Sequence, residues 1–119
     1  MKNIKILLLL FAFLVVSIVS ANGIEPNFKK QGKLIKGTFF YQDGTISQEG
    51  TYKDGKLHGQ WISYDQNGKK TALANYTDGK KTGKWFFWSP KGLTEVDYAN
   101  NKIVKVANYN QKEEILNKD

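Results

Sequence analysis

The chain has 119 residues and a formal net charge of +7, from 18 basic and 11 acidic side chains, and every basic one is a lysine. It contains no cysteine and a single histidine. This composition excludes a disulfide framework, a thiolate metal site and a histidine-rich metal site, and the length allows one short domain at most.

Residues 1–21 are typical of a cleaved export signal, in which a basic start precedes an apolar run and then small residues. Two lysines lie before the uncharged run 6–19, and the tripeptide that ends at Ala21 fits the small-x-small rule. We therefore expect cleavage after Ala21 and a periplasmic or secreted protein. The alternative is an uncleaved membrane anchor, although a spanning helix needs roughly 20 apolar residues and this run is shorter.

The rest of the chain repeats itself at a spacing of 24 residues. The pattern Tyr-x-x-Gly-x-x-x-Gly-x-Trp-x-x-aromatic-x-x-x-Gly begins at Tyr52 and again at Tyr76. An earlier unit over 28–44 is looser, and a later one from Tyr98 is degenerate, as expected where end units cap an array. We assign structural roles to the recurring residues Tyr52, Gly55, Gly59, Gly68, Tyr76, Gly79, Gly83 and Gly92.

Within these units, aromatic and β-branched runs alternate with turn dipeptides, which predicts strands joined by tight turns. Glycine supplies the positive φ that such turns need, and Asp or Asn tolerates it next best. The turn signals are Asp43-Gly44, Asp54-Gly55, Asn67-Gly68, Asp78-Gly79, Ser89-Pro90-Lys91-Gly92 and Asn100-Asn101. The predicted strands are 34–41, 45–53, 57–64, 69–76, 83–88, 93–99 and 102–109.

The fold class that follows is all-β: an extended antiparallel meander of β-hairpin repeats in a single curved sheet, after an N-terminal signal helix. The predicted organisation is a signal peptide (1–21), an N-terminal arm (22–33), a repeat domain (34–109) and a polar tail (110–119), where 111–117 has a weak helical period.

Two glycines inside strands invite a packing interpretation. Gly59 and Gly83 each lie two residues before a tryptophan, and Gly37 holds the equivalent position in the early unit. A strand glycine often marks a close approach of another group. Such a glycine either makes room for an aromatic ring of the neighbouring repeat or simply begins its strand.

These units resemble the MORN repeat in its bacterial variant form, well over 52–92 and more weakly over 28–51 and 93–109. The resemblance implies a long curved sheet and a binding function without enzyme activity. Many bacterial variants are catalogued as antitoxins, so it also implies a protein toxin as partner. The export signal departs from a cytoplasmic antitoxin and agrees with an immunity protein that blocks a toxin in the periplasm.

The polar residues offer no catalytic or metal-binding constellation. His58 lies at a turn-to-strand junction with no cysteine or paired base beside it, and Thr82 holds the same position in the next unit. The acids Asp43, Asp54, Asp65 and Asp78 are explained by their turns. We therefore expect no enzyme, no metal and no cofactor.

The tetrapeptide Trp85-Phe86-Phe87-Trp88 must place aromatic rings on both faces of one strand, because successive strand residues point to opposite faces. One face packs within the sheet. The other needs a cover, from the N-terminal arm, from residues 108–119, from a second protein or from a ligand. The candidate binding surface comprises Trp61, Tyr64, Trp85, Phe87 and Trp88.

Lysines flank many of the turns and suggest a choice of partners. Together with the aromatic side chains, they predict a protein partner or, as the alternative, a membrane surface or an envelope polymer. They also serve the simpler roles of solubility and protection of strand edges. The absence of arginine argues against nucleic acid, because arginine dominates base and bidentate phosphate recognition.

Overall fold

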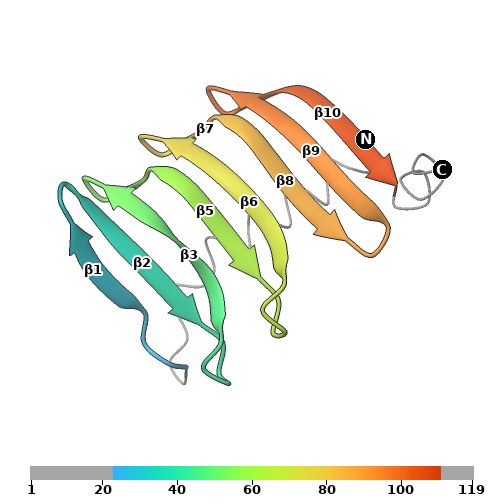
Figure 1. Ribbon diagram of the computed structural model, residues 1–119. Coiled ribbons are helices and arrows are strands. Elements are labelled where there is room, and N and C mark those ends of the chain that lie inside the picture. The colour runs from blue at the N-terminus through green and yellow to red at the C-terminus, as the bar shows by residue number, and fades with distance from the viewer. Residues whose placement is uncertain (1–22, 111–119) are drawn as a thin grey trace.

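A computed structural model describes residues 23–110, which form one antiparallel sheet (Figure 1). The main path runs β1-β2-β3-β5-β6-β8-β9-β10, and the short β4 and β7 pair with β3 and β6. The strands are β1 (Asn27–Gln31), β2 (Leu34–Phe40), β3 (Ile46–Lys53), β4 (Lys56–Leu57), β5 (Gly59–Tyr64), β6 (Lys70–Thr77), β7 (Lys80–Lys81), β8 (Gly83–Ser89), β9 (Gly92–Ala99) and β10 (Lys102–Asn110).

The predicted all-β antiparallel sheet is confirmed for the described residues. Every predicted strand is present, although the strand expected at 57–64 divides at His58 into β4 and β5. The predicted turns all lie between strands. The predicted signal helix and the helical period at 111–117 lie outside the described residues. Within 23–110 no helix is long and apolar enough to cross a membrane.

Strand β1 is the main element that the sequence did not predict. It occupies residues 27–31 of the expected N-terminal arm and pairs along its whole length with β2. Its tight turn is Gly32-Lys33, where Gly32 has φ +62°. Because β1 is an exposed edge strand with two adjacent lysines, it lacks the apolar alternation that reveals a half-buried strand.

The hairpins have two kinds of turn. In three two-residue turns both central residues have positive φ, as type I′ geometry requires: Asp54-Gly55, Asp78-Gly79 and Asn100-Asn101. At the other end of the strands the two-residue turn Pro90-Lys91 closes β8–β9, and the longer loops 41–45 and 65–69 close the other two hairpins. In one of them the Asp65 carboxylate accepts hydrogen bonds from the N–H groups of Asn67 and Lys69, both at 2.9 Å. The aspartates therefore have the turn-forming role that their positions predicted.

One face of the sheet, called the core face below, carries most of the buried side chains. They are Phe39, Gln48, Trp61, Ser63, Ala72, Ala74, Tyr76, Trp85, Phe87, Val96 and Tyr98. The strand register puts Trp61 opposite Ala74, and Trp85 opposite Val96. Tyrosine rings meet the tryptophans edge to face, Tyr52 on Trp61 at 5.0 Å and Tyr76 on Trp85 at 5.1 Å. The 24-residue repeat therefore appears in space as a repeated tyrosine–tryptophan contact.

Each repeat tryptophan also ties its strand to the strand before it. The Trp61 indole Nε1–H donates to the carbonyl of Thr51 at 2.9 Å, and Trp85 Nε1–H donates to the carbonyl of Asn75 at 3.0 Å. The same carbonyls accept the N–H groups of His58 and Thr82. These bonds lie where a long strand stops pairing with a short strand and begins to pair with the next long strand. The indole N–H therefore supplies a hydrogen bond to a main-chain carbonyl where the strand ladder is interrupted.

Of the three glycines that the sequence suggested, only Gly37 makes room for an aromatic ring. Gly59 and Gly83 begin strands with positive φ, and no ring lies within 4 Å of a Cβ built there, so the packing interpretation is wrong for both. It is correct for Gly37, beside the rings of Tyr52 and Phe28. The closest approach is at Gly50, where a Cβ would lie 2.1 Å from Cδ2 of Trp61.

Gly50→Ala is therefore expected to lower the free energy of unfolding by about 3 kcal/mol or more, because the ring has to leave its slot. Urea unfolding followed by circular dichroism measures this. In a Trp61→Leu background the same substitution should cost much less. An equal cost in both backgrounds would show that the ring does not occupy this slot.

The hydroxyl of Tyr76 is buried without a hydrogen-bond partner among the described residues, and this burial strongly raises its pKa. Tyr76→Phe should leave stability unchanged or raise it by up to about 1 kcal/mol, because an unsatisfied polar atom is removed. Tyr41→Phe is the matched control. Its hydroxyl donates to the carbonyl of Tyr64 at 2.5 Å, so its loss should cost about 1 kcal/mol. Equal losses of unfolding free energy for the two variants, measured by urea unfolding, would contradict this expectation.

Candidate functional site

The structure divides the five predicted binding residues between the two faces of the sheet. Trp61, Trp85 and Phe87 lie on the core face, where Trp85 is only 1% exposed and contacts Phe87. Tyr64 and Trp88 lie on the opposite face. The first three residues therefore hold the fold together, and the last two remain as candidates for contact with a partner.

On the opposite face, six large side chains form an apolar patch across β5, β6, β8 and β9. Phe86 and Trp88 stack with centroids 6.1 Å apart and planes at 25°. Trp88 is 37% exposed, and the others are half-buried. The register runs from Ile62 to Leu73 to Phe86, and from Trp88 to Leu93. The patch comprises Ile62, Tyr64, Leu73, Phe86, Trp88 and Leu93.

Four of these residues were not part of the binding surface predicted from the sequence. Ile62, Leu73 and Phe86 alternate with buried neighbours, so a strict period-2 count would have placed them together on the second face. Leu93 required the register with Trp88. No cover from the arm or the tail lies over β8 in the described part. Residues 27–31 and 108–110 are strands of the same sheet.

Charged groups border the patch. Lys84 contacts Glu95 at 3.0 Å and Asp97 at 3.3 Å, and hydrogen bonds to these carboxylates raise the pKa of Lys84. Burial, followed by the negative charge of Glu49, raises the pKa of Tyr64. Beside Trp88, a hollow of about 370 Å³ is lined by Asp65, Lys69, Lys70, Thr71, Trp88, Ser89 and Pro90. The patch thus combines an exposed ring with lysines at its rim.

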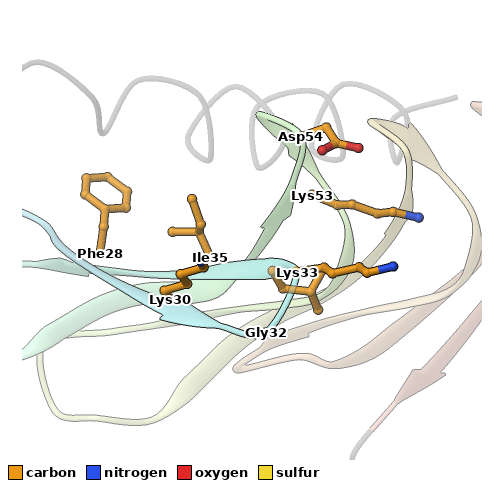
Figure 2. A pocket seen from close by; sticks show the side chains of 8 residues that line it. Phe28, Lys30, Gly32, Lys33, Ile35, Lys53 and Asp54 are labelled. Carbon is orange, nitrogen blue, oxygen red and sulfur yellow. The ribbon is translucent and has the colours of Figure 1, made fainter.

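A second hollow, of about 610 Å³, lies at the β1–β2–β3 end of the sheet. Figure 2 shows Phe28 and Ile35 both pointing upward, whereas the side chains of Lys33 and Lys53 both extend to the right. Both apolar side chains are exposed. Lys30 and Asp54 also line this basic pocket, so three lysines face one carboxylate. Its walls suit a ligand with a negative charge and an apolar part.

His58 has a structural role at a hairpin tip. Its Nδ1 accepts a hydrogen bond from the N–H of Asp78 at 3.1 Å. Beside it, Gly79 N–H donates to the carbonyl of Leu57 at 2.8 Å, so the tip of one repeat joins the next. Among residues 23–110, no cluster of three His, Asp or Glu side chains is arranged to hold a metal ion.

The family described as MORN repeat variant matches residues 33–54 and 57–78. These two ranges are similar to MORN repeats. These repeats are non-enzymatic modules that are often involved in binding. No curated protein matches the chain.

The matched ranges differ from the resemblance noted in the sequence. They include 33–51, which belongs to the range 28–51 where the resemblance is weaker, and stop before 79–92, which belongs to the range 52–92 where it is good. In the structure, all three units are antiparallel hairpins, although β8–β9 closes with a two-residue turn and the other two close with longer loops. Trp85 makes the contacts of Trp61 one repeat later, with Tyr76 in the place of Tyr52.

The two tryptophans at the ends of one tetrapeptide should respond differently to truncation. Trp85→Ala removes a buried ring and its hydrogen bond, and is expected to cost about 3–5 kcal/mol. Trp88→Ala removes a partly exposed ring and should cost about 1 kcal/mol or less. Thermal and urea unfolding of both variants would measure this. Equal losses would contradict the assignment of the two rings to different faces.

Proposed function

We propose that this protein is a non-enzymatic binding module that holds a protein partner on its apolar patch. The observation that carries the proposal is the stacked Phe86–Trp88 pair, with Trp88 exposed on a face that no described segment covers. Aromatic anchors in such patches supply much of the binding energy at protein interfaces. The proposal also agrees with the general binding role of the repeat.

The rim of the patch defines the chemistry of the partner. Lys69 and Lys70 line the hollow beside Trp88, and Lys91 lies in the adjoining β8–β9 turn. A partner that inserts an apolar side chain and surrounds it with carboxylates would complement this surface. An exported immunity protein that blocks a toxin is the specific form of this function that the sequence implies. Residues 1–21 support an encounter outside the cytoplasm.

Capture from the envelope and secreted fractions of the source cells tests the proposal. The partner should remain bound to the purified protein after a high-salt wash and should be lost from a Trp88→Ala variant. It should then be purified and bind wild type in stoichiometric amount. Equal binding to wild type and Trp88→Ala would exclude the patch. Whether cells still grow when they express the partner's gene would show whether the partner is a toxin.

The basic pocket favours a second function, association with an anionic surface such as lipid headgroups or an envelope polymer. Four lysines and no acid lie in residues 27–40, beside the exposed Phe28 and Ile35. Vesicles with anionic lipid should then bind the protein at low salt only, because charge attraction is screened by salt. Combined Lys33→Ser and Lys53→Ser should abolish this binding, whereas Trp88→Ala should retain it. The opposite pattern would assign the binding to the apolar patch.

A further inference from the structure

The two edges of the sheet differ in length and in charge. β10 is the last strand of the described sheet and pairs only with β9, so the main-chain groups along its outer side have no strand partner there. It spans nine residues, against five for β1 at the other edge. An unpaired edge of this length is a template for another strand.

The side chains of β10 do little to block such pairing. Val104 is 68% exposed, and Ile103, Val106 and Tyr109 are also exposed. Lys105 is the only charged residue among 103–110. At the other edge, β1 has Lys29 and Lys30 at its centre, so pairing between two copies would put like charges opposite each other. β1 is therefore protected, whereas β10 is open.

We propose that two copies of this chain join through antiparallel pairing of their β10 strands, which makes a closed dimer with a continuous sheet. An antiparallel contact between identical strands is related by a two-fold axis and leaves no further β10 edge. The occupant is a second copy because the strand can pair with itself without a charge clash, and because its exposed apolar side chains are then covered by the same side chains.

The register is set by the faces of the strand. Pairing with β9 is uninterrupted over residues 105–110, and a bulge lies between Ile103 and Lys105. Opposed residues must lie on the same face, so the two-fold axis passes through a residue. An axis at Lys105 would oppose two charges, and one at Ala107 would put Val106 opposite Asn108. An axis at Val106 brings the two valines together on the core face, beyond the buried Val96.

This register also gives each Lys105 a carboxylate. The partner's Lys105 would lie opposite Ala107, whose own neighbour on β9 is Glu95. Two strand spacings separate these positions, about 10 Å, which an extended lysine and glutamate span across the small alanine. The contact is confined to one strand, and interfaces of such limited area dissociate readily. We therefore expect a dimer that forms reversibly with rising concentration.

Sedimentation velocity of the full chain, over a wide range of concentrations, tests the dimer. The weight-average mass should rise toward twice the monomer and stop there. Val106→Lys puts two charges at the axis and should raise the dissociation constant at least about tenfold. Val104→Lys introduces the same charge at the bulge and should retain the dimer. A mass that stays at the monomer, or equal behaviour of the two variants, would overturn the proposal.

A crosslink tests the register independently, because the chain has no cysteine of its own. Val106→Cys should form a disulfide-linked dimer under mild oxidation, and Phe28→Cys on β1 should not. Circular dichroism confirms that the variants fold. Crosslinking through Phe28→Cys, or growth into open polymers by pairing of β10 with β1, would contradict a closed β10 dimer.

Discussion

The indole of the repeat tryptophan is the interaction on which this sheet depends. In each of two repeats it donates to a main-chain carbonyl of the preceding strand, at 2.9 Å from Trp61 and 3.0 Å from Trp85. The Trp61 ring fills the space left by Gly50 on one side and lies opposite Ala74 on the other. One side chain thus supplies both apolar burial and a hydrogen bond at the point where the strand ladder is broken.

This arrangement explains why a short chain without disulfides can use a single sheet. Aromatic rings pack in tilted and edge-to-face contacts around Trp61 and again around Trp85 on the core face, and the hairpin tips join consecutive repeats through main-chain bonds. Each unit contacts mainly its neighbours, as in other repeat proteins. The opposite face is then free to vary, and here it carries an exposed aromatic pair. Stability and binding are separated by the alternation of strand residues.

The sequence was enough to predict the strands and turns, because Asp-Gly and Asn-Gly dipeptides and aromatic runs are local signals. It missed β1, whose lysine-rich edge position removes the alternation that marks a half-buried strand. It named Gly59 instead of Gly50, because only strand pairing reveals which glycine faces Trp61. It also grouped Trp85 with Trp88, although their parity in β8 sends them to opposite faces. Register was the missing information for Gly50, whereas Trp85 and Trp88 could have been separated by counting alternate residues along the strand.

Hydrogen exchange of the three indole N–H groups, followed by NMR, tests the central role of the repeat tryptophans without any substitution. The indole protons of Trp61 and Trp85 should exchange only through global unfolding, as slowly as the amides of the central strands. The indole proton of Trp88, on the opposite face, should exchange much faster. Exchange of Trp61 and Trp85 at the rate of Trp88 would show that their hydrogen bonds do not hold the repeats together.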